Sequence, residues 1–217
     1  MRSHFNPRNL AGLAAVLASS LALGSCASEL TRTGSSAAYV VIESLLGASG
    51  ARPDQFGSPL LSDVVTLVQT TVNGSPVSAP TYYNDLAQVS MRAALKNPGT
   101  TLNPTTPSSN TAITFNRYHV DFRRTDGRNT QGVDVPYSFD GAATFTVPAG
   151  GQALFAVEVV RNQAKLESPL VNLRQGGGGI IISTIAEVTF YGRDQVGNEV
   201  VATGQMTVNF GDFADPS

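Results

Sequence analysis

The residues that could carry acid–base or metal chemistry are few in this chain, and the central one is His119. His119 and Asp121 lie two residues apart in a segment where apolar and polar side chains alternate, so both should share one face of a strand. Such a pair could act as a general base and its orienting carboxylate, or supply two ligands to a metal ion. No nucleophile is evident beside it, and zinc needs more ligands than one histidine and scattered aspartates. We therefore interpret the pair as part of a solvated strand face.

A basic cluster surrounds this histidine. It contains four arginines with two aspartates among them: Arg117, Asp121, Arg123, Arg124, Asp126 and Arg128. The interleaved signs favour paired surface charges, and contact with an anion or a glycan is the alternative.

Three further motifs could contact a ligand, and each also has a structural explanation. Tyr82 and Tyr83 could stack on a sugar ring, but paired tyrosines near a strand start more often pack against their own domain. The turn 194–199 offers oxygen atoms to calcium, yet it lacks the spaced acids of an EF-hand loop, and Gly197 suits a hairpin turn. The glycine run 176–179 lacks the residues that end a phosphate-binding loop.

The segments that hold these residues are predicted to be strands. Apolar and polar residues alternate with a period of two, which is typical of an antiparallel sheet packed on one side. The alternation covers 89–96, 117–123, 143–147, 186–191 and 202–210, and further strands are expected at 39–44, 64–72 and 153–160. Short turns of helix are admitted only within 60–68 and 83–94.

Turn signals separate these strands, including Asn73-Gly74, Asp126-Gly127 and Gly197-Asn198. The segment 100–111 is rich in proline, threonine and serine and is expected to be a long surface loop. Seven to nine short strands with turns between them predict an all-β fold, an antiparallel two-sheet sandwich.

The segment TIAEVTFYGRDQVGNEVVATGQMTVNF, residues 184–210, resembles the last hairpin of immunoglobulin-like or fibronectin type III-like bacterial domains. It combines an amphipathic strand, a turn of the form Asp-x-x-Gly-Asn and a closing amphipathic strand. The resemblance implies an immunoglobulin-like sandwich and implies no activity, because such sandwiches host many functions. The cysteine pair and core tryptophan of antibody domains are absent, since the chain has one Cys and no Trp.

The N-terminus has the order of an export signal. Arg2 and Arg8 precede an apolar stretch at 10–23 that is too short to span a bilayer comfortably. The stretch ends in Leu-Gly-Ser-Cys, which resembles the bacterial lipobox. This resemblance implies cleavage before Cys26, attachment of acyl chains such as palmitate to Cys26, and anchorage in a membrane; an ordinary signal peptide is the alternative. Ala27 favours the outer membrane if the organism is Gram-negative.

Removal of residues 1–25 would leave 192 residues with 12 basic and 16 acidic side chains, a net charge of −4. This mild acidity argues against a nucleic-acid partner. Acylation of Cys26 would leave no thiol, so neither a disulfide nor a thiol nucleophile is expected. We predict three regions: a signal peptide at 1–25, a lipidated cysteine and flexible tether at 26–37, and a β-sandwich domain at 38–217.

These observations predict a lipoprotein of the cell envelope that acts as a binding or structural module and not as an enzyme. Its partner would be another envelope protein or a polysaccharide, with no cofactor and no metal. The loops 97–111 and 174–179 are the expected contact surfaces. The alternative is a carbohydrate-binding or hydrolytic accessory protein, and the candidate binding residues are Tyr82, Tyr83, His119 and Asp121.

Overall fold

The computed structural model describes residues 35–175, 180–213 and 215. The predicted signal peptide at 1–25, Cys26, most of the predicted tether and the glycine run 176–179 lie outside the described residues. Within these residues the fold is all-β, as the alternation predicts. No helix in the described part of the chain is long and apolar enough to cross a membrane.

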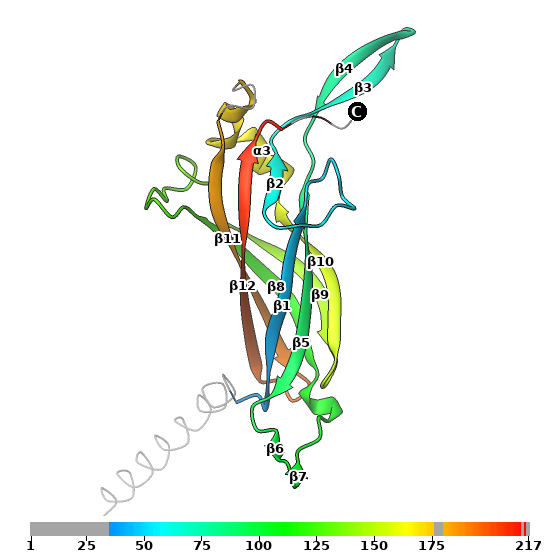
Figure 1. Cartoon of the computed structure of the whole chain (residues 1–217), viewed down its shortest axis with the longest axis vertical. Coiled ribbons are helices and arrows are strands. Elements are labelled where there is room, and N and C mark those ends of the chain that lie inside the picture. Colours follow the sequence, from blue (N-terminus) through cyan, green and yellow to red (C-terminus); the bar gives the residue numbers. More distant parts are fainter. Residues whose placement is uncertain (1–34, 176–179, 214, 216–217) are drawn as a thin grey trace, which may run out of the picture.

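Two sheets form the sandwich (Figure 1). Three strands make the smaller sheet, in the order β1 (Ala38–Ala48), β5 (Asp85–Leu95) and β10 (Gln152–Val160). Five make the larger one, in the order β2 (Leu60–Asp63), β12 (Glu199–Gly211), β11 (Ile182–Asp194), β8 (Ile113–Arg123) and β9 (Phe139–Val147). Their pairing is antiparallel except between β2 and β12, which run parallel. The eight strands fall within the expected number.

The alternation predicted for the strands is confirmed, because the apolar residues that alternate along β8, β11 and β12 face the core. Phe122, Val188, Phe190 and Val208 are all buried, whereas Arg123 is exposed. The sheets meet through aromatic side chains: the Phe155 ring on β10 lies 5.8 Å, edge-on, from the Phe190 ring on β11. Burial of apolar side chains, these rings among them, is the main favourable contribution to folding in a domain without a disulfide.

The helical expectations were wrong. Segment 60–68 forms β2 and the start of β3 (Thr66–Val72), and 83–94 lies largely in β5. Pairing of β2 with β12, and of β5 with β1 and β10, outweighs any local helical preference of these segments. Short helices form instead at α3 (Asn162–Leu166) and η2 (Leu170–Gln175). The expected loop 100–111 carries the short pair β6 (Gly99–Thr100) and β7 (Asn103–Pro104), followed by η1 (Ser109–Thr111).

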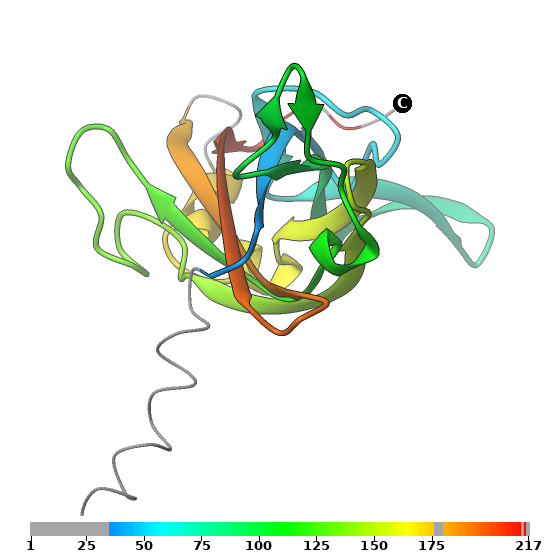
Figure 2. The same cartoon turned by 90° about the horizontal axis from the view of Figure 1, so that it is seen from below.

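The sandwich is elongated, and its two ends differ (Figure 1). The start of β1, at Ala38, and the β6–β7 hairpin lie at one end. At the other end β3 and β4 (Ser75–Thr81) project as a separate two-stranded ribbon. A view from below confirms that this ribbon extends sideways from the body (Figure 2). We call residues 66–81 the arm.

Candidate interaction site

His119 and Asp121 share one face of β8, as predicted, but each has a different partner. His119 Nδ1 lies 3.2 Å from Asp140 Oδ1 on the neighbouring strand β9. Asp121 Oδ2 lies 3.7 Å from Arg123 Nε, and Arg123 also pairs with Glu187 on β11. Exposed ion pairs of this kind contribute about 0–1 kcal/mol each. The pair therefore belongs to a ladder of surface charges on the outer face of the larger sheet.

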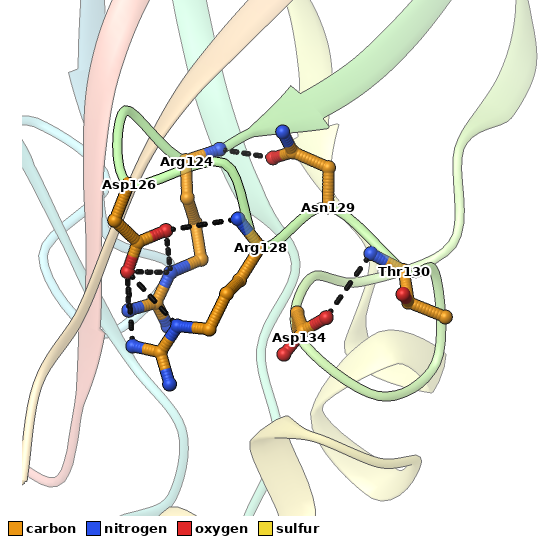
Figure 3. Close-up of polar contacts among 6 residues, drawn as sticks. All are labelled: Arg124, Asp126, Arg128, Asn129, Thr130 and Asp134. Carbon is orange, nitrogen blue, oxygen red and sulfur yellow. Dashed lines mark hydrogen bonds and ion pairs between the residues drawn. The ribbon is translucent and has the colours of Figure 1, made fainter.

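The basic cluster is divided between β8, which carries Arg117, Asp121 and Arg123, and the loop between β8 and β9. In that loop the Asp126 carboxylate joins Arg124 and Arg128 (Figure 3). Asp126 Oδ2 lies 2.7 Å from Arg124 Nη2 and 2.9 Å from Arg128 Nη2. Hydrogen bonds from Arg124 and then Arg128 hold the pKa of Asp126 well below its usual range. The Arg124 amide donates to Asn129 Oδ1 at 2.6 Å, which closes the loop. Paired surface charges, the favoured interpretation of this cluster, account for these contacts.

Tyr82 and Tyr83 lie in the segment that joins the arm to β5. The Arg174 guanidinium covers the Tyr82 ring, 4.4 Å from its centroid. Tyr83 packs against Gly50, where a side chain would collide with its Cβ. Both tyrosines thus contact their own domain, and stacking on a sugar stays a prediction.

The turn 194–199 uses its aspartate internally. Asp194 Oδ1 accepts hydrogen bonds from the amides of Val196 at 3.0 Å and Asn198 at 2.9 Å, and Oδ2 accepts one from Asn198 Nδ2 at 2.8 Å. Burial alone would raise the pKa of Asp194, but these hydrogen bonds bring it below its ordinary value. Gly197 has a φ of +96°, as its turn position requires. In the described part of the chain, no group of three His, Cys, Asp or Glu side chains could hold a metal ion.

A buried ion pair lies at the end of the sandwich from which the arm projects. Lys165 Nζ on α3 donates to Asp85 Oδ1 at 2.8 Å, and both residues are 0% exposed. The same carboxylate accepts hydrogen bonds from Ser62 Oγ at 2.5 Å and from the Gly50 amide at 2.8 Å. Burial raises the pKa of Asp85, and the Lys165 charge and these hydrogen bonds oppose that rise. Sequence reasoning missed this cluster, since 80 residues separate its two charges.

This cluster fastens both ends of the arm to the body. Ser62 belongs to β2, which precedes the arm, and Asp85 opens β5, which follows it. Next to it, Asp63 accepts hydrogen bonds from Thr66 Oγ1 at 2.8 Å and from the Phe213 amide at 3.1 Å. The arm therefore leaves a firmly bonded base, although the arm itself is exposed.

The arm is a regular hairpin that packs on neither sheet. Asn73 and Gly74 have φ values of 51° and 81°, as a two-residue hairpin turn needs. Val68, Val72 and Val77 share one face with Thr70, and the three valines are 37%, 51% and 44% exposed. An isolated two-stranded hairpin is at best marginally stable in water, and stable sheets need a third strand or a packed face. This surface is the strongest candidate for contact with another molecule.

Comparison with known proteins adds no functional information. No protein-family model matches the chain, and no curated protein is significantly similar to it. A solved structure described as the X-ray structure of Northeast Structural Genomics Consortium target SoR45 is 11% identical, with a TM-score of 0.35, over 79% of this chain and 86% of that chain. A TM-score this low carries no argument about function.

Proposed function

We propose that the chain is a lipid-anchored lipoprotein of the bacterial cell envelope, with an immunoglobulin-like sandwich that acts as a non-enzymatic binding module. The arm is its contact surface. The observation that carries the proposal is the position of the arm, at the opposite end of the sandwich from the start of β1 (Figure 1). The predicted tether from Cys26 leads to the start of β1, at Ala38. A domain held at the Ala38 end presents the arm away from its attachment point.

The composition of the arm supports a role in binding another molecule and not in catalysis. From Val64 to Asn84 the chain contains no Asp, Glu, Lys or Arg. An exposed apolar face without charge has a low desolvation cost, so it suits a contact that is buried on association. The polar candidates on the outer sheet face, by contrast, are joined to their own neighbours.

The anchor is tested by labelling cells with a fatty acid and partitioning the protein into detergent. Wild type should incorporate label and enter the detergent phase, because each buried methylene contributes about 0.8 kcal/mol to anchorage. Cys26→Ser should do neither. Label in the variant, or its absence from wild type, contradicts the lipoprotein proposal.

The binding surface is tested with an arm-shortened variant that lacks 67–72 and 75–80. This deletion moves the Asn73-Gly74 turn directly between Thr66 and Thr81. These two residues face each other across the hairpin as Val72 and Ser75 do, and the two pairs are an even number of residues apart, so the turn keeps its geometry. The base contacts of Asp63 and Asp85 stay intact. Chemical crosslinking in intact cells at matched abundance should show partner adducts in wild type and lose them in this variant.

Two further variants separate the arm from the other candidates. His119→Ala should retain the adducts, because its contact with Asp140 is exposed. A variant shortened within 97–111 tests the loop favoured by the sequence. Loss of adducts only in the loop variant would move the binding surface to the tether end of the domain. A requirement for His119 or Tyr82, together with binding of envelope polysaccharide, would support the carbohydrate-related alternative.

A further inference from the structure

The two free edges of the arm differ in their ability to pair with another strand. Pro76 and Pro80 lie in β4, and a proline has no amide hydrogen for a ladder bond. These prolines must therefore occupy the positions of β4 that point away from β3, together with Ser78. Two of three outward amides are missing, so this edge is closed to strand addition.

The outer edge of β3 has no such protection. The β3 residues opposite Pro80, Ser78 and Pro76 are Leu67, Gln69 and Thr71, so their backbone groups also point outward. The outward amide nearest the body, that of Leu67, is already used, because it donates to Asp215 Oδ1 at 2.7 Å. Gln69 and Thr71 remain available, and no third strand joins the arm within the described residues.

We propose that β3 of the arm pairs with β3 of a second copy of this chain, antiparallel and two-fold symmetric. This inference rests on the proposed function, because it names the partner of the arm. Gln69 lies opposite Thr71 of the second copy, and Thr70 lies on the symmetry axis. A register centred on Gln69 would need the Leu67 amide, which Asp215 already holds.

Two observations favour a second copy over an unrelated strand. Identical strands bring like residues together near a two-fold axis, and an uncharged arm avoids the repulsion that like charges would cause there. In addition, strand pairing between identical chains leads to a fibre unless the outer edges of the resulting sheet are blocked. In the proposed dimer the two outer strands of the four-stranded sheet are β4 of each copy, and the prolines of β4 block both outer edges.

Pairing also completes an apolar layer. Val68, Val72 and Val77 of both copies would lie on one face of the four-stranded sheet, with Thr70 at its centre. A stable sheet needs at least three strands with an apolar face; the four-stranded sheet of the dimer has them, whereas the lone hairpin does not.

Disulfide trapping in intact cells tests the inference. Thr70→Cys is expected to give a covalent species at twice the mass of the chain, because residues across a non-hydrogen-bonded pair lie about 4.5 Å apart at Cα, within disulfide range. Ser78→Cys on the closed edge is the matched control and should stay at the single-chain mass. Wild type, run in parallel, reports any contribution of Cys26.

Two proline variants supply an independent readout by sedimentation of the protein in mild detergent. Thr71→Pro removes an outward amide and leaves the hairpin ladder intact, so the dimer should be lost while the circular dichroism spectrum is kept. Pro76→Thr restores an outward amide on β4 and should yield assemblies larger than a dimer.

The proposal of a second copy is contradicted if Thr70→Cys gives no covalent homodimer and the wild-type protein sediments as a monomer. A disulfide adduct between Thr70→Cys and another envelope protein would contradict the proposal of a second copy, but would keep the arm as a binding surface. No arm adduct of any kind, with crosslinks unchanged in the arm-shortened variant, would overturn both the second copy and the proposed function.

Discussion

Replacing Lys165 with methionine should destabilise the domain severely and in a pH-dependent way. The side chain has a similar length, so the change removes the charge and leaves most of the volume. Asp85 would then be a carboxylate with no exposed surface and no counter-charge, held only by Ser62 and the Gly50 amide. Removing one partner of a buried pair costs about 3–5 kcal/mol. We expect a loss of that size in the free energy of unfolding at pH 7.

The loss should shrink on acidification. Burial already raises the pKa of Asp85 in the folded state, and removal of Lys165 raises it further. A carboxyl group with a raised folded pKa stabilises the fold below its unfolded pKa, and this contribution disappears as the pH rises through the folded pKa. The free energy of unfolding of the variant should therefore approach that of wild type near pH 4, and the difference between them should grow toward neutral pH.

The assay is urea unfolding followed by circular dichroism, since the chain has no tryptophan. Arg92→Met is the control, because Arg92 pairs with Glu43 at 2.9 Å on the surface, and its loss should cost about 0–1 kcal/mol. The double variant Asp85→Asn/Lys165→Met should lose less than the sum of the single variants, as expected for groups in contact. Equal losses for Lys165→Met and Arg92→Met, or a loss independent of pH, would refute the buried ion pair.

Two more outcomes test the core and the arm base. Phe190→Ala should cost about 3–5 kcal/mol, because the ring is fully buried between the sheets, whereas Thr189→Ala on the outer face should cost much less; equal unfolding midpoints would mean that the register is wrong. Burial raises the pKa of Asp63 against hydrogen bonds from Thr66 and the Phe213 amide, so its contribution to stability is present below about pH 4 and declines as the pH rises through its folded pKa. Asp63→Asn should flatten that part of the pH–stability profile, and an unchanged profile would show that another group is responsible.

The core could be predicted from the sequence because alternation is a local signal. A one-residue slip would expose Val188 and Phe190 together, so their spacing alone determines the buried face of β11. The turn at Asn73-Gly74 was equally local. Both predictions needed only residues that are neighbours in the chain.

The parts that the sequence did not reveal depend on contacts between distant segments. Lys165 and Asp85 each look like ordinary surface residues in their own segments, and only the packing of α3 against the start of β5 joins them. The arm was predicted as a strand at 64–72, but nothing local says that a strand leaves the sandwich. Its uncharged sequence is the one available signal, and it becomes informative once the arm is known to be exposed.

The central claim is that the arm, and not the sheet face, contacts the partner. Photocrosslinking in intact cells measures this directly when one photoreactive residue replaces Val72 on β3 of the arm or Val201 on the outer face of β12. The two valines are matched in type and similar in exposure, at 51% and 56%. We predict an adduct from position 72 and none from position 201. An adduct from position 201 alone, or from neither position, would contradict the claim.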